Sequence, residues 1–203
     1  MNIIIFAFYA FVVLYSVILH ELSHGLMAQS MGDPTAKYAG RLTLNPFKHL
    51  DLFGSILLPL LTYYTGGFIF GYAKPVPYNP LNLSDQKYGP AKVAAAGPLS
   101  NILLAVLFGL VLRFSPSVAG NLILADFLKF IVNINLMLAI FNLIPIQPLD
   151  GHWLLFTFLP KRYIELKYFL ARYGIFILLI FILFFSRYLM PLRDFLFRVI
   201  VGT

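Results

Sequence analysis

MNIIIFAFYAFVVLYSVILHELSHGLMAQSM, residues 1–31, is an apolar run interrupted by one compact group of acidic and basic side chains. A helix needs about 20 apolar residues to cross the hydrocarbon core of a bilayer. This run supplies that length before Gly32-Asp33-Pro34 ends it. It has no basic segment at its start and no small-residue cleavage site. We therefore expect a membrane helix that stays on the mature protein.

Further apolar runs follow along the chain. The stretch 152–159 is apolar but too short to span, and 52–72 is broken by Gly54, Pro59 and Gly66-Gly67. The pattern predicts an all-α polytopic membrane protein with four to six membrane segments. Its runs after the first are residues 52–72, 92–112, 122–144 and 168–190.

The composition excludes several classes of protein. Only 11% of the 203 residues are charged, 60% are hydrophobic, and the mean hydropathy is +0.85. A water-soluble fold of this size could not hide so much apolar surface. The chain has no cysteine, which excludes a disulfide scaffold, a thiolate metal site and a catalytic cysteine. The net charge of +7 is spread over short loops, so we expect no nucleic-acid partner.

The charged group in the first run is His20-Glu21-Leu22-Ser23-His24. Positions i and i+4 share one face of a helix, so the two histidines can bind one metal ion. Glu21 follows the first histidine and can act on water without being a ligand. Zinc suits two imidazoles with an open position. A lone helix histidine is more often a packed core residue, but three ionisable side chains inside a membrane run indicate function.

A third protein ligand has to come from elsewhere in the chain. Asp150 lies in the segment Asn142 to His152, where two prolines hold an extended backbone. Irregular backbone at membrane depth occurs against protein or a watered cavity. We favour Asp150 because a carboxylate offsets zinc charge, and His152 is the competing ligand. The other acids lie in loops, at the ends of runs, in the tail or, for Asp126, in an i,i+3 pair with Lys129.

With these residues the chain resembles the site-2 protease family of intramembrane zinc metalloproteases. The resemblance rests on His20 to His24 and on the Asn-x-x-Pro…Leu-Asp-Gly element from Asn142 to Gly151. It implies that His20, His24 and Asp150 bind one zinc ion. It also implies that Glu21 is the general base and that Asn142 stabilises the oxyanion.

Two further segments support the same resemblance. Gly97-Pro98-Leu99-Ser100-Asn101 is similar to a small-residue segment of the family, and residues 71–80 are similar to a linker of its short bacterial and archaeal members. We expect one membrane-embedded domain over residues 1–203, with a catalytic core at 1–155 and C-terminal helices at 156–203. A PDZ or CBS domain is not expected.

Topology follows from charge and from the need to bring Asp150 to the histidines. The first basic residue is Lys37, which places the N-terminus outside and residues 37–48 in the cytoplasm. Asp150 reaches the histidines if the run 122–144 is parallel to the first helix. The run 52–72 then has both ends in the cytoplasm, as a re-entrant hairpin. Residues 192–200 have the spacing of an interfacial amphipathic helix.

A short β element is expected in the loop 36–46. Residues 41–44 alternate like a strand and have no sequence partner. The element would either pair with an extended substrate by strand addition or form an internal hairpin of the loop.

The sequence thus predicts a zinc endopeptidase in the cell membrane, inner or plasma, that cuts transmembrane protein or peptide substrates near the cytoplasmic side. The alternative is a membrane zinc transporter or sensor that uses the same ligands without hydrolysis. Only hydrolysis requires the non-ligating base Glu21.

Overall fold

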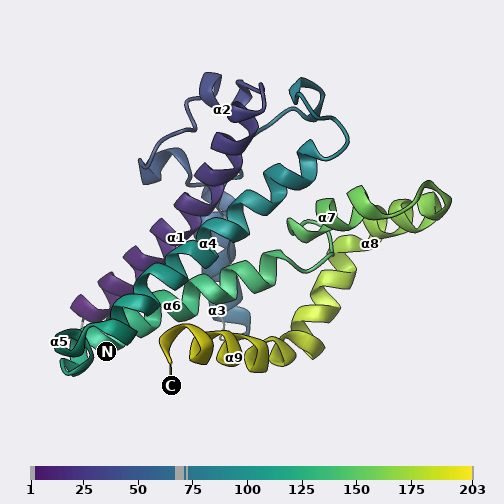
Figure 1. Cartoon of the computed structure of the whole chain (residues 1–203). Coiled ribbons are helices and arrows are strands. Elements are labelled where there is room, and N and C mark those ends of the chain that lie inside the picture. The colour runs from purple at the N-terminus through teal and green to yellow at the C-terminus, as the bar shows by residue number, and fades with distance from the viewer. Residues whose placement is uncertain (1–2, 67–70, 72, 203) are drawn as a thin grey trace.

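The computed structural model describes residues 3–66, 71 and 73–202, and all regular secondary structure in these ranges is helical (Figure 1). This confirms the predicted all-α membrane fold. The helical stretches that are long and apolar enough to cross a membrane are α1 (Ile3–Ser30), α4 (Gly89–Phe114), α6 (Leu122–Asn142) and Ile164–Val201. Many large apolar side chains on them face outward, as a lipid environment requires.

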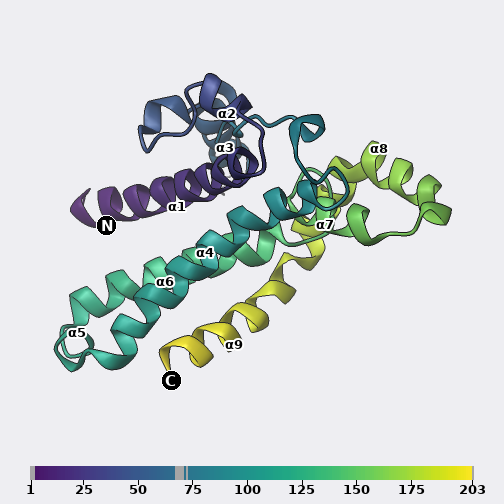
Figure 2. The same cartoon turned by 45° about the horizontal axis from the view of Figure 1, so that its top comes forward.

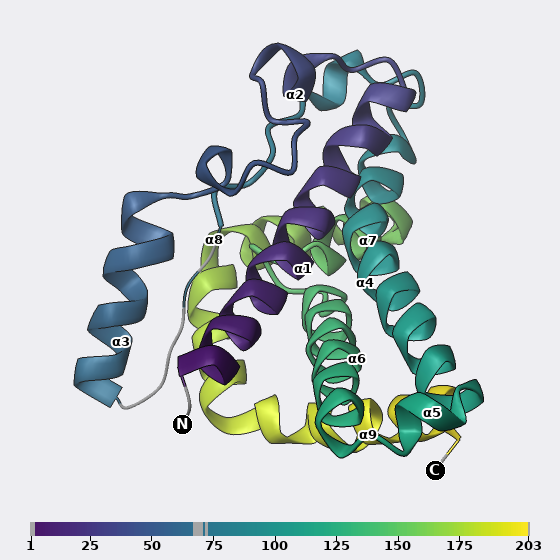
Figure 3. The ribbon, with the colours of Figure 1, turned by 90° about the vertical axis from the view of Figure 1, so that its left-hand side faces the viewer.

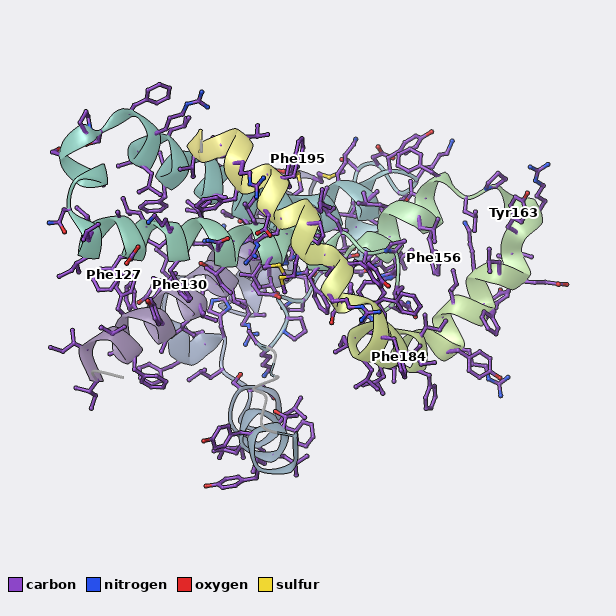
Figure 4. All side chains as sticks on the ribbon, turned by 90° about the horizontal axis from the view of Figure 1, so that it is seen from below. Phe127, Phe130, Phe156, Tyr163, Phe184 and Phe195 are labelled. Atoms are coloured by element: carbon purple, nitrogen blue, oxygen red, sulfur yellow. The ribbon has the colours of Figure 1, made fainter. Side chains whose placement is uncertain are left out.

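Helices α1, α4 and α6 form the core of the molecule. Figure 3 shows α1 and α6 running in one direction with α4 antiparallel to them. The short helix α5 (Pro116–Ala119) connects α4 to α6. Phe127 and Phe130 of α6 point toward α1 in Figure 4, where they stack on Phe8 and Tyr9 at centroid distances of 4.2 and 4.1 Å. The parallel order of α1 and α6 is the one expected from the position of Asp150.

The connection between α1 and α4 is mostly irregular and contains short helices. The amide of Lys74 donates to the carbonyl of His49 at 2.9 Å, so the two ends of the segment between these residues lie next to each other. Its described helical part, 53–66, is about 21 Å long, less than a hydrocarbon core of about 30 Å. The helices of the connection are α2 (Thr35–Tyr38), η1 (Pro46–Lys48), η2 (Phe53–Leu57), α3 (Leu58–Gly66) and η3 (Pro80–Asn82).

The predicted short β element at 36–46 is not found. These residues form the end of α2, turns and the start of η1. Side chains bind the backbone here: Arg41 donates to carbonyls of the connection, and His49 Nε2 donates to the Thr43 carbonyl at 2.8 Å. The prediction of an internal hairpin is therefore wrong, because side-chain donors and not a second strand form the hydrogen bonds of this loop.

The C-terminal part begins with α7 (Gly151–Phe158) and η4 (Lys161–Tyr163). Then α8 (Ile164–Ile180) continues through η5 (Phe181–Phe185) and η6 (Ser186–Tyr188) into α9 (Leu189–Val201). Figure 2 shows α9 beside α4 and α6. Leu196, Ile200 and Val201 pack on the cluster formed by α4 and α6. The helix predicted for 192–200 is confirmed, and part of its apolar face contacts protein.

Candidate metal centre

Three predicted ligands meet between α1 and the segment that follows α6. One ligand atom from each of His20, His24 and Asp150 lies within 4.8 Å of the other two. Asp150 Oδ2 is 3.0 Å from His20 Nε2 and 3.3 Å from His24 Nε2. Both histidines are buried, and their rings are nearly perpendicular at 86°. Helical spacing brings the histidines together, and the return of the chain after α6 adds the aspartate.

The second ring nitrogen of each histidine is fixed by α4. His24 Nδ1 lies 2.7 Å from the Val93 carbonyl, and His20 Nδ1 lies 2.6 Å from Asn101 Oδ1. These oxygens can only accept hydrogen bonds, so Nδ1 carries the proton in both neutral rings. Each Nε2 therefore presents a lone pair to the other and to Asp150.

Asn101 is itself oriented by a buried polar network across three helices. Its amide donates to Asn135 Oδ1 at 2.8 Å and to the Ser16 carbonyl at 3.2 Å. Asn135 in turn donates to Ser16 Oγ at 3.0 Å. Because both amide hydrogens of Asn101 are used, its oxygen must face His20. In the sequence, Asn101 stands in a small-residue segment that indicates no role for it, and an asparagine within an apolar helix is the available signal.

Gly97 lies directly against the metal-facing nitrogens. A Cβ at this position would be 2.5 Å from His24 Nε2 and 2.6 Å from His20 Nε2. Any side chain would occupy the space that the two lone pairs face. Glycine at 97 thus keeps that space open.

The segment that carries Asp150 is braced on two sides. Gly151 packs against the carbonyls of Leu143 and Ile144, so a Cβ there would collide with backbone. Gly174 of α8 packs on Gln147, with only 2.7 Å between an added Cβ and the Gln147 Cβ. These close approaches fix the turn that places Asp150 beside the histidines.

The remaining predicted residues lie around this group. Glu21 Oε2 accepts a hydrogen bond from the Val76 amide at 2.8 Å. Asn142 Nδ2 donates to the Leu138 carbonyl of its own helix at 2.9 Å, so it would have to turn to reach a substrate. His152 Nδ1 lies 2.6 Å from the Leu149 carbonyl, and its ring packs on Trp153 and Phe156, apart from the three-residue group.

The donor set fits zinc. Three acceptor atoms that face one another repel unless a cation or a proton is shared among them. Zinc bonds of 2.0–2.1 Å in a tetrahedron separate two ligands by about 3.3 to 3.4 Å, close to the spacing of Asp150 from the histidines. Two imidazoles and one carboxylate leave a position free, as catalytic zinc sites do.

Comparison with known proteins agrees with this geometry. The sequence model of peptidase family M50 matches residues 8–119 and 117–183, which is most of the chain. The chain belongs to peptidase family M50. The predicted resemblance to the site-2 proteases, which this family contains, is thereby confirmed.

Relatives of the M50 chain bear matching names. It is 39% identical over 151 residues to "Putative zinc metalloprotease YwhC" of Bacillus subtilis, covering 71% of the chain and 66% of the relative. It is 32% identical over 140 residues to "Putative zinc metalloprotease Rip2" of Mycolicibacterium smegmatis, covering 68% and 52%. The alignments thus span about half to two thirds of these relatives. No solved structure matches the chain.

Proposed function

We propose that this M50 chain is an intramembrane zinc endopeptidase in which His20, His24 and Asp150 hold one zinc ion. The observation that carries the proposal is the convergence of these ligand atoms within 4.8 Å, with both Nδ1 atoms directed to acceptors. Three acceptors gathered in one place, two of them on buried side chains, favour a bound cation. Residues 1–203 then form one membrane-embedded protease domain, with the catalytic core at 1–155.

The chemistry follows from the residue types. Zinc, when bound, supplies a Lewis acid for the scissile carbonyl and for water. The Glu21 carboxylate accepts a proton from the attacking water and delivers it to the leaving nitrogen. Asn142 is the proposed donor to the oxyanion, once its amide leaves the Leu138 carbonyl. Gly97 leaves room for the ion beside the Nε2 atoms of His20 and His24, which a Cβ at this position would approach to 2.6 and 2.5 Å.

We place the cleavage site near the cytoplasmic side of a multi-pass protein of the cell membrane, with transmembrane proteins or peptides as substrates. Residues 115–121 contain no basic side chain, whereas residues 37–92 and 161–167 contain nine. Residues 52–72 are the proposed re-entrant hairpin, which the contact between His49 and Lys74 supports. The basic residues of the cytoplasmic connections are Lys37, Arg41, Lys48, Lys74, Lys87, Lys92, Lys161, Arg162 and Lys167.

A zinc transporter or sensor with the same ligands is the alternative. Transport requires successive sites with exchangeable ligands along a route. Within the described ranges, His20, His24 and Asp150 form the single group of three or more side chains that could hold a metal ion. A single buried site beside a glutamate favours hydrolysis.

Replacement of Glu21 by glutamine separates the two functions. Glu21→Gln should keep the bound zinc, because the ligands are unchanged, and lose about 10² to 10⁴ in cleavage rate. The matched control is Glu165→Gln, which removes the other glutamate of the chain from an exposed site on α8. Zinc content by elemental analysis and cleavage of a model transmembrane substrate are the measurements. Full cleavage by Glu21→Gln would refute the protease mechanism.

A further inference from the structure

Residues 73–82, here called the strap, run from the end of the proposed hairpin along α1. The Lys74 amide donates to the His49 carbonyl at 2.9 Å. The Asn79 amide donates to Asp33 Oδ2 at 2.6 Å, just beyond the C-terminal end of α1. Figure 3 shows α3 standing apart from α1. Hydrogen bonds therefore hold the strap in place on both sides of Val76.

Val76 contacts the face of α1 that carries Glu21. Its amide lies 2.8 Å from Glu21 Oε2. Its side chain is buried against Gly25, where an added Cβ would be 2.8 Å from Val76 Cγ1. Glu21 and Gly25 are four residues apart and share one helical face. This face is distinct from the face on which His20 and His24 meet α4.

The sequence Lys74-Pro75-Val76-Pro77 makes this contact specific. The two prolines have no amide hydrogen, so Val76 carries the single backbone donor between residues 75 and 77. That donor is directed to Glu21. The strap offers no neighbouring amide that could replace it after a small shift.

Arg41 sets the position of the strap on α1. Its guanidinium donates to the carbonyls of Lys74 at 2.8 Å and Pro75 at 3.2 Å, and also to the Lys48 carbonyl. The side chain is buried, and its described partners are carbonyl oxygens. The Arg41 guanidinium thus joins the two ends of the segment between residues 48 and 75. The second of these ends directly precedes Val76.

We propose that the Val76 amide, held in place by Arg41, positions the Glu21 carboxylate for proton transfer. The inference rests on the proposed function, in which Glu21 is the base. A carboxylate has two oxygens, so one can accept from Val76 while the other faces the water. Val76 acts through its backbone, and Arg41 is a positioning residue that acts through Val76.

The direct test is Val76→Pro, which removes the amide hydrogen, with Val76→Ala as a control that keeps it. We expect Val76→Pro to lower kcat about tenfold to a hundredfold, as misplacement of a catalytic group does. Its KM and zinc content should stay within about twofold, and Val76→Ala should retain most of kcat. In Glu21→Gln protein, Val76→Pro should cause no further loss, because both changes act on one group.

The outcomes separate this inference from the function itself. Wild-type kcat in zinc-loaded Val76→Pro protein, or an equal loss from Val76→Pro with and without Glu21, overturns the positioning role. Full cleavage by Glu21→Gln alone overturns the proposed function instead.

Arg41 provides a second test that does not depend on a proline in the strap. Arg41→Ala should lower kcat about tenfold with KM and zinc unchanged, and added guanidinium ion should restore part of it. The control is Arg162→Ala, which removes an exposed arginine in η4. A loss of zinc, a rise of KM alone, or loss without guanidinium rescue would contradict positioning of Glu21 by Arg41.

Discussion

The helical core around the metal ligands and the connection between α1 and α4 are held together in different ways. In the core, the side chains of Ser16, Asn101 and Asn135 bind across three helices whose backbones are already hydrogen-bonded. In the connection, Arg41 and Asp33 bind irregular backbone directly. Every buried backbone group must be satisfied, and helices satisfy their own. The positions of the proposed ligands His20 and His24 thus depend on the core, and the position of Glu21 depends on the connection.

Loss of a ligand from the core should have the largest effect. Asp150→Ala should abolish high-affinity zinc binding and cleavage, because two imidazoles alone leave zinc short of protein ligands. His152→Ala should keep about one zinc per chain, since His152 binds the Leu149 carbonyl instead. Elemental analysis of both purified variants checks this. The opposite ranking would make Asp150 a group that merely orients a histidine.

Breaking the buried network should weaken the metal site without removing a ligand. Asn101→Leu leaves His20 without its acceptor and should lower zinc affinity about tenfold to a hundredfold. Asn133→Leu is the matched control, because Asn133 donates only to the Lys129 carbonyl on the exposed side of the same helix as Asn135. Competition with a zinc chelator measures both affinities. Equal affinities in the two variants would mean that His20 does not need Asn101.

The stability of the connection between α1 and α4 should depend on pH through the ionisation of Asp33. Burial opposes ionisation of this carboxyl, but donors from Thr35, Asn82 and the Asn79 amide outweigh it and lower its pKa from 3.8. The hydrogen bonds of the Asp33 carboxylate therefore contribute fully to the stability of the connection above pH 3.8. This contribution is lost as the pH falls through the lower pKa that Asp33 has in the folded state. The protection of the amides of residues 79–84 against hydrogen exchange, relative to the intrinsic rate at the same pH, should fall in acid. Asp33→Asn should show fast exchange already at neutral pH, whereas Asp126→Asn should behave as wild type.

The topology of the connection can be tested without affecting activity. The chain has no cysteine, so single cysteines at Lys37 and Gln86, both exposed, can be labelled cleanly. A membrane-impermeant maleimide should label both from the same side, because 52–72 is proposed to be re-entrant. A cysteine at Ser117 should label from the other side. Labelling of positions 37 and 86 from opposite sides would show that 52–72 spans the membrane.

Sequence patterns revealed the parts of the molecule that local rules govern. Run length predicted the membrane helices, and i,i+4 spacing predicted that His20 and His24 meet. The i,i+3 pair of Asp126 and Lys129 is likewise present at 3.0 Å. The β element failed because alternation over a few residues does not provide a partner strand. Arg41 instead binds carbonyls that lie seven to thirty-four positions away.

The sequence by itself therefore determined the helical membrane fold, the shared helical face of His20 and His24 on α1 and the place of Glu21 next to it, because helix periodicity and apolar length are local properties. Only the tertiary structure decided which groups orient those side chains. Asn101 lies 81 positions from His20, and Val76 lies 55 positions from Glu21. Nothing near either residue in the chain encodes such a contact. It exists because antiparallel packing of α4 on α1, and the return of the strap along α1, bring polar groups from distant parts of the chain within hydrogen-bond distance of His20 and Glu21.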